Sequence, residues 1–234
     1  MSDTANPPKL ASAAEFDARL KRADEDRWLA SRYAPAVDRE RIAAIYLLNQ
    51  ELQRTLQTSE PMLGKIRLQW WRETMEQVAG NGPVRRHDLA EELARVLAGR
   101  ADLHAAAAGL IDCYDDILDD HLHAGGHQPG GDHEARHLAV EGAVMKLAGI
   151  ALDATVAPEH LATLAALGEA RIALSADLPH AAARWHSACQ AARKLPAALW
   201  PAILHLALVD LPSPQASDFA RRWRLLKTAF THRL

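Results

Sequence analysis

The chain has 234 residues, of which 49% are hydrophobic, and 27 basic residues stand against 30 acidic ones. This length and content allow one large domain with a sizeable core, and the nearly balanced charge gives no reason to expect a nucleic-acid partner. The two cysteines, Cys113 and Cys189, lie far apart and form no CxxC pair. They favour reduced cytoplasmic thiols over a disulfide framework.

Helix periodicity runs through nearly the whole chain. We expect a disordered tail over residues 1–12 and a single helical domain over 13–234. After short helices that end near 22 and 33, Pro35 interrupts the chain and Asp38 is the expected N-cap of the next helix. That helix carries one apolar stripe, made of Ile42, Ile45, Leu48, Leu52 and Leu56.

Residues 59–64 are expected to form a turn, and a second amphipathic helix follows to residue 80, with Leu68, Trp71, Met75 and Val78 on its core side. Further helices are predicted at about 87–99, 103–123, 133–156, 159–175, 180–194, 196–209 and 215–231. Residues 138–152 are apolar nearly all round, which indicates a central buried helix. Pro201 should kink or divide its helix. The pattern predicts an all-α bundle.

No apolar run resembles a signal peptide, and none approaches the length that spans a membrane. We therefore expect a cytoplasmic protein without a transmembrane segment, and peripheral contact with the inner membrane stays open.

The stretch "DCYDDILDD" (112–120) is the most chemical-looking part of the chain. At 100° per residue its five aspartates share one arc of a helix, and Leu110, Tyr114, Ile117 and Leu118 share the opposite arc. Such carboxylates suit Mg²⁺. The sequence holds no second acidic motif to clamp a diphosphate from the other side, and the run lies near a helix C-terminus, where carboxylates are disfavoured. A solvated acidic face is the preferred interpretation. A magnesium site at Asp115, Asp116, Asp119 and Asp120 is the alternative.

Histidines gather between residues 121 and 137, around a glycine-rich loop. His133 and His137 are four residues apart and suit a transition metal. Metal ligands are usually held by rigid elements, whereas this loop is rich in glycine and therefore flexible, and no HExxH pattern is present. An exposed polar loop is therefore favoured over a metal site.

Three stretches in the first third of the chain resemble the squalene/phytoene synthase family. They are "DRWLASRYAP" (26–35), "IAAIYLLNQELQR" (42–54) and "SEPMLGKIRLQWWRETMEQVAG" (59–80). The likeness continues more weakly through "VEGAVMKLAGIAL" (140–152), "LPAALWPAILHLAL" (195–208) and "RRWRLLKTAF" (221–230). Within the family it is greatest to the branch that contains mitochondrial complex I assembly factor 6. The resemblance implies the isoprenoid-synthase fold, with helices around a central cavity.

Catalytic members of that family join two prenyl diphosphates and use two aspartate-rich motifs to bind Mg²⁺. The resemblance places the first motif on the helix after Tyr46, where this chain has Gln53, Arg54 and Gln57. It places the second within 167–185, where Asp177 is the only acidic residue of the second half. A glutamine binds Mg²⁺ weakly and an arginine repels it, so both motifs are expected to be missing.

The resemblance therefore predicts a non-catalytic protein without a cofactor. It would serve as an accessory factor for a protein partner of the respiratory-complex assembly type, or bind an isoprenoid-like lipid. The alternative is an Mg²⁺-dependent prenyltransferase that uses the relocated aspartates 115–120. If an anionic ligand binds, the expected contacts are Arg54, Arg67 and Arg72, with Trp70, which falls off the apolar stripe, beside them. Arg72 is also expected to pair with Glu76 one turn on.

Overall fold

The computed structural model describes residues 12–58, 60–80, 82–123, 131–211 and 216–234. Every regular element in these ranges is a helix, which confirms the all-α prediction. The elements are α1 (Ala13–Ala23), α2 (Glu25–Ser31), α3 (Ala36–Gln53), the 3₁₀ helix η1 (Arg54–Gln57), α4 (Pro61–Ala79), α5 (Asp88–Val96), α6 (Ala101–His123), α7 (Gly131–Leu152), α8 (Pro158–Ser175), α9 (Ala181–Ala192), the 3₁₀ helices η2 (Ala197–Ala202) and η3 (Leu204–Leu208), and α10 (Asp218–Thr231).

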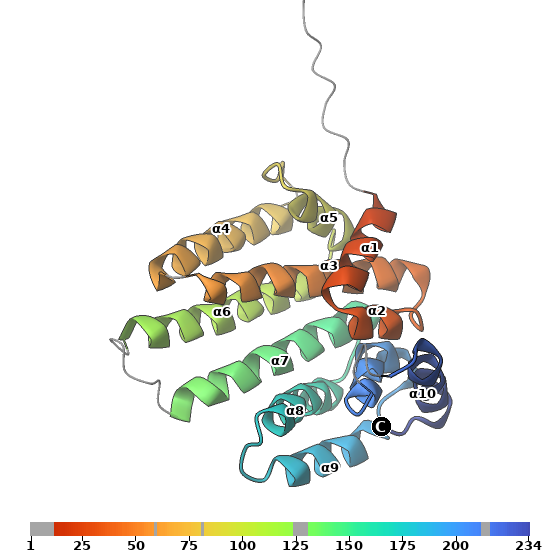
Figure 1. Cartoon of the computed structure of the whole chain (residues 1–234). Coiled ribbons are helices and arrows are strands. Elements are labelled where there is room, and N and C mark those ends of the chain that lie inside the picture. Colours follow the sequence, from red (N-terminus) through yellow and green to blue (C-terminus); the bar gives the residue numbers. More distant parts are fainter. Residues whose placement is uncertain (1–11, 59, 81, 124–130, 212–215) are drawn as a thin grey trace, which may run out of the picture.

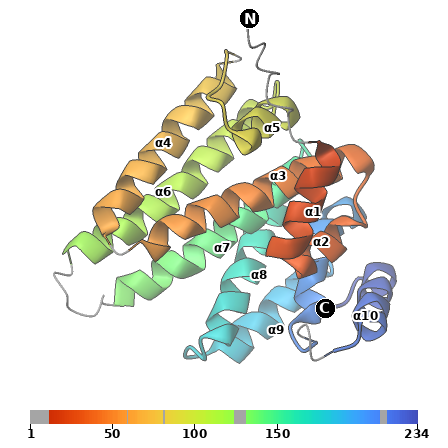
Figure 2. The same ribbon diagram turned by 45° about the horizontal axis from the view of Figure 1, so that its top comes forward.

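The long helices lie side by side as a stack. Figure 1 shows α4, α6, α7, α8 and α9 following one another across the molecule, and α3 crosses against α6 and α7. The short helices α1 and α2, together with α10, close one end of this stack, and Figure 2 shows α10 at the outer edge of the same end. Residues far apart in the chain, such as those of α2 and η3, are thereby brought into contact.

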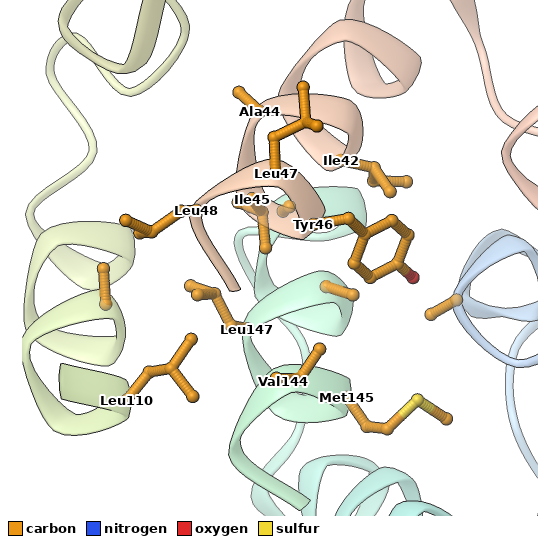
Figure 3. Packing of buried hydrophobic residues seen from close by; sticks show 14 of the residues in the cluster. Ile42, Ala44, Ile45, Tyr46, Leu47, Leu48, Leu110, Val144, Met145 and Leu147 are labelled. Atoms are coloured by element: carbon orange, nitrogen blue, oxygen red, sulfur yellow. The ribbon is translucent and has the colours of Figure 1, made fainter. Parts of the chain in front are cut away.

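The core is built on the apolar stripe of α3. Ile42, Ile45, Leu48 and Leu52 are at most 1% exposed, as their spacing predicts. Figure 3 shows Leu48 directed toward α6, which carries Leu110, and Ile45 directed toward Leu147 of α7. The predicted central helix is likewise buried over most of its length. Apolar side chains thus fill the space between α3, α6 and α7.

Two predicted boundaries are wrong. Pro35, not Asp38, is the N-cap residue of α3, because its fixed φ suits the residue that enters a helix; Asp38 lies in the first turn and pairs with Arg41 at 2.9 Å. The expected turn at 59–64 is mostly helix, because Pro61 occupies the first position of α4, where its missing N–H costs nothing. The prediction for Pro201 is confirmed: its segment is two 3₁₀ helices that meet at Ile203.

The glycine of the "EPMLGK" stretch allows a close helix contact. A Cβ at Gly64 would lie 2.7 Å from the carbonyl oxygen of Thr55 and 2.9 Å from a methyl carbon of Leu118. Real Cβ atoms do not approach backbone oxygens so closely. Gly64 therefore lets α4 pack directly on η1 and α6.

Two predictions fall largely outside the described residues. Of the expected tail, only Ser12 is described, and it caps α1 with its side chain. Most of the glycine loop is outside as well. None of the helices within the described ranges has the length and apolar character needed to cross a membrane.

Candidate functional site

A polar cavity of about 300 Å³ lies among five helices. Its lining residues come from α2 (Asp24 at its N-cap, Arg27), α3 (Asn49, Gln50, Gln53), α6 (Tyr114), α7 (His137, Val140, Glu141) and α8 (Arg171, Ile172), with Leu56 of η1. The resemblance implies a central cavity, and this polar cavity, surrounded by α2, α3, α6, α7 and α8, is the candidate for it.

The deepest charges of the cavity form a bridge between three helices. Arg27 donates through one terminal nitrogen to Glu141 and through the other to Asp24 at 3.2 Å. Arg171 reaches the same Glu141 oxygen from α8 at 3.3 Å. Arg27 and Glu141 are 5% and 6% exposed. Two cations and two carboxylates therefore balance one another in the cavity wall.

Burial and pairing act in opposite directions on these groups. Burial alone would raise the pKa of Glu141, but the charges of Arg27 and Arg171 outweigh it and hold that pKa below its ordinary value. Burial likewise acts to lower the pKa of Arg27, and the charge of Glu141 raises it instead. Both groups are therefore charged at neutral pH, and the pair is an ionic element of the fold.

Neutral polar groups complete the wall. The Tyr114 hydroxyl donates to Asn49 Oδ1 at 2.8 Å. Arg27 lies over the ring of Tyr46, 5.0 Å from its centroid, and among the described residues the buried Tyr46 hydroxyl has no hydrogen-bond partner. Behind them, burial and then the charges of Arg27 and Arg171 put the pKa of His205 well below its ordinary value. The imidazole is therefore neutral.

The positions expected for the first metal motif straddle the end of a helix. α3 ends at Gln53, which lines the cavity, and Arg54 and Gln57 belong to η1. The exposed Gln57 is not part of the lining. For the second motif, Asp177 is exposed beyond the end of α8, in the left-handed conformation with φ 52°. Arg171 occupies the cavity wall on that side.

Three of the four predicted ligand contacts share a different site. Arg54, Arg67 and Trp70 line a groove of about 300 Å³ between η1 and α4, together with Glu51, Thr55, Trp71 and His87. The rings of Trp70, Trp71 and His87 meet edge to face, with centroids about 5 Å apart. Arg54 is paired with Glu51 at 2.7 Å. Ligand binding in this groove stays a prediction.

Arg72 is not part of that groove. It does not serve the expected surface pair with Glu76 either, but reaches across to α6, where it lies 2.7 Å from Asp112 and 3.5 Å from Asp115. The helix periodicity could place Arg72 beside Glu76 but could not show which helix would lie against it.

The aspartate run faces cations from two neighbouring helices. From α4, Lys65 lies 2.7 Å from Asp115 and 2.8 Å from Asp119. From α7, Arg136 lies 2.9 Å from Asp120 and 3.8 Å from Asp116. The interpretation as a solvated face is corrected to this extent: Asp115 and Asp120 are only 27% and 21% exposed in their side chains. The opposite, apolar arc is buried as predicted.

These contacts do not fit a magnesium site. The ammonium group of Lys65 takes the place between two carboxylates that a divalent ion would occupy. Within the described side chains, no three His, Cys, Asp or Glu residues group so that they could hold a metal ion. For the histidine alternative, the side chain of His133 lies outside the described residues, and His137 lies at the polar cavity.

Comparison with known proteins agrees with part of this picture. Residues 20–118 match the squalene/phytoene synthase family model. The match contains the three strongest stretches of the resemblance, so the resemblance is confirmed for α2, α3 and α4. The matched residues make up less than half of the chain. Searches of curated proteins and of solved structures found no match. In this squalene/phytoene synthase-like region, Arg27, Asn49, Gln53 and Tyr114 supply one side of the cavity.

Sequence reasoning missed the ionic bridge, although signals for it were present. Arg27 and Glu141 both lie in stretches that carry the resemblance, "DRWLASRYAP" and "VEGAVMKLAGIAL". Glu141 is also an ionisable residue in the helix predicted to be apolar nearly all round. A buried charge of this kind requires a partner, and that requirement could have marked the helix as part of a site.

Proposed function

We propose that the whole chain is a non-catalytic member of the squalene/phytoene synthase family and acts by binding, as an accessory factor of the kind represented by mitochondrial complex I assembly factor 6. The observation that carries this proposal is the ionic bridge of Arg27, Glu141 and Arg171. The bridge lines the same cavity as Gln53, one of the positions expected for the first metal motif, and its carboxylates are paired with arginines, whereas a prenyl-diphosphate enzyme needs free carboxylates for its metal ions.

The size of the cavity supports the proposal. About 300 Å³ is at the lower end of the range for sites of small ligands, and a head-to-head condensation must hold two prenyl chains with their diphosphates. The neighbouring space between α3, α6 and α7 is filled by side chains (Figure 3). Without clamped ions, ionisation of the leaving group loses its main electrostatic assistance.

Accessory function for a partner protein is favoured over binding of an isoprenoid-like lipid because of the polarity of the cavity wall. An isoprenoid chain is apolar, whereas the cavity is walled by Asp24, Arg27, Glu141 and Arg171. A cytoplasmic location at the inner membrane, where respiratory complexes are assembled, belongs to this proposal.

The decisive experiment has two parts. Purified protein incubated with Mg²⁺ and farnesyl or geranylgeranyl diphosphate should release no pyrophosphate above the buffer blank. In a deletion strain of the native host, assembled complex I should decrease on blue-native gels and be restored by the wild-type gene and equally by Asp116→Asn. Pyrophosphate release at enzyme-like rates that Asp116→Asn abolishes would establish the relocated-aspartate prenyltransferase instead.

A further inference from the structure

The helix α10 presents an unusual outer face. Phe219, Trp223, Leu226 and Phe230 are 77%, 59%, 38% and 81% exposed. At 100° per residue these four positions fall within about 60° of one another, so they form a continuous apolar stripe. The rings of Phe219 and Trp223 stack nearly parallel, with centroids 6.4 Å apart. Scattered exposed apolar residues are normal, but an aligned aromatic stripe indicates an interaction surface.

The opposite face of α10 fixes the direction of this stripe. Arg221 is 1% exposed and pairs with both Glu25 and Asp26 of α2. Leu225 and Thr228 are buried on the same side. Because these anchors lie on the side away from the stripe, the aromatic side chains are held outward. Figure 2 shows α10 at the edge of the molecule, where a flat surface can reach it.

Charge identifies the occupant of this surface. From Phe219 to Leu234 the sequence has five Lys or Arg residues and no Asp or Glu. Arg222 and Lys227 flank the stripe on either side, each about 40° beyond its edge on the helix. Both are exposed, as is Arg224, and within the described residues none of the three forms a salt bridge. Free cations bordering an apolar face are typical of helices that lie in the interface of an anionic membrane.

We propose that α10 is an in-plane membrane anchor that binds the surface of a bilayer containing anionic phospholipid. The stripe enters the boundary between headgroups and acyl chains, while Arg222 and Lys227 contact lipid phosphates. Phe219, Trp223 and Leu226 of the stripe also line a cleft of about 330 Å³ between α2 and α10, to which Leu29 and Tyr33 contribute from the other side, so the apolar contact extends into this cleft. A second copy of the chain is a poorer occupant, because a two-fold interface would bring the same cations face to face.

This inference deepens the proposed function by specifying how the protein is held at the membrane, and its test is separate from the pyrophosphate and complementation assays. Full-length protein is mixed with vesicles of phosphatidylcholine alone or with added phosphatidylglycerol, and bound protein is separated by flotation. We expect binding to the anionic vesicles and weakening at high salt, since surface charges are screened.

Three variants make the test specific. Phe219→Ser/Trp223→Ser/Phe230→Ser should weaken binding by about tenfold or more, and Arg222→Gln/Lys227→Gln should weaken it roughly 30-fold. The matched control, Met62→Ser/Ile66→Ser, removes apolar side chains that are 56% and 60% exposed on α4, far from α10 (Figure 1), and should bind as the wild type does. All these side chains lie on the surface, and unchanged thermal unfolding verifies that each variant folds.

A fluorescence measurement tests whether Trp223 of α10 enters the bilayer. Brominated lipid should quench tryptophan fluorescence of the bound wild type, and Trp223→Phe, which keeps the apolar face, should bind normally with less quenching. The proposal is overturned if the protein does not float with anionic vesicles, or if the triple serine variant floats as well as the wild type. It is equally overturned if light scattering shows a dimer that the serine substitutions dissolve, which would assign the stripe to self-association.

Discussion

The ammonium nitrogen of Lys65 lies 2.7 Å from Oδ1 of Asp115, across the contact between α4 and α6. A residue of α4, within the region that matches the squalene/phytoene synthase family model, thereby pairs with two aspartates of the run that looked most like a metal site. Partial burial acts to lower the pKa of Lys65, but hydrogen bonds to Asp115 and Asp119 outweigh it and raise that pKa.

Replacement of Lys65 should lower the stability of the protein, because the aspartates of α6 then repel one another more strongly. Lys65→Met removes the cation that Asp115 and Asp119 share and leaves Asp115 with the more distant Arg72 at 3.5 Å. We expect the free energy of unfolding to fall by about 1 kcal/mol, since these groups are partly screened by solvent. Urea unfolding measures the change. In a double-mutant cycle, Lys65→Met should cost less when Asp115→Asn is already present. Strictly additive effects would show that the pair contributes nothing.

Magnesium should leave the wild-type protein unchanged. Because Lys65 holds the position between the two carboxylates, millimolar Mg²⁺ should not raise the thermal unfolding temperature of the wild type beyond the effect of matched ionic strength with NaCl. A specific Mg²⁺-dependent increase that Asp115→Asn removes would contradict this account of the aspartate run.

The buried bridge at the cavity should be far more sensitive. Glu141→Gln removes the charge that Arg27 and Arg171 share and leaves Arg27 buried without its main counter-charge. We expect a loss of about 3–5 kcal/mol in the free energy of unfolding. Asp116→Asn, at a carboxylate whose side chain is 64% exposed, is the control and should change little. Similar small losses for both variants would mean that the bridge is not formed.

Acid should weaken the same bridge. The pKa of Glu141 is lower in the folded protein than its ordinary value of 4.5, because the charges of Arg27 and Arg171 outweigh burial. Its contribution is therefore fully present above about pH 4.5 and is lost as the pH falls through the folded pKa. Glu141→Gln should lack this part of the pH dependence in urea unfolding measured from pH 6 downward.

A separate loss of stability should begin nearer neutrality. His205 is buried beside Arg27 and Arg171, and its pKa lies well below the ordinary 6.5, so below pH 6.5 the unfolded chain takes up a proton that the folded protein excludes. The free energy of unfolding should fall by up to about 1.4 kcal/mol per pH unit from this group. His205→Leu should flatten the slope between pH 6.5 and 5, whereas His186→Leu, at an exposed position, should not. Equal slopes in the wild type and His205→Leu would refute it.

Two glycines in helices test the contact between α4 and α6. Both gain helix propensity when replaced by alanine, which is worth about 1 kcal/mol. A Cβ at Gly109 meets nothing within 4 Å, so Gly109→Ala should stabilise the protein. Gly64→Ala should instead destabilise it by about 1–3 kcal/mol, because the new methyl group overlaps Thr55 and Leu118. Thermal unfolding of the two variants should shift in opposite directions.

The local pattern was sufficient for much of the fold. The apolar arc of α6, which includes Tyr114 and Ile117, and the core side of α4, which includes Leu68 and Trp71, are buried as their spacing predicts. Helix ends were less predictable. Asp38 has the chemistry of a cap, but Pro35 begins the helix one turn earlier, and Pro61 opens α4 where a turn was expected. Several residue types suit the first turn of a helix, so the sequence leaves its start ambiguous by a few positions.

The candidate site is formed by residues that are far apart in the sequence and meet only in the tertiary structure. Arg27 and Glu141 are 114 residues apart, and Lys65 and Asp115 are 50 apart. Helical periodicity states which side of each helix is polar, but not which helix lies against it. The same limit applies to the four predicted ligand contacts. Arg54, Arg67 and Trp70 share a groove, as a common ligand site would require, but the sequence could not show that Arg72 pairs with Asp112 of α6.

The sequence by itself determined that this chain is helical and which face of each long helix enters the core. These properties follow from residue type and spacing within single helices, where the forces act over a few residues. The tertiary structure decided how the charges are partnered: cations on the aspartate run, an ionic bridge in the cavity, and an aromatic stripe of α10 left uncovered. Those outcomes depend on which helices pack together, because an ion pair or an exposed face is a property of two surfaces and not of one.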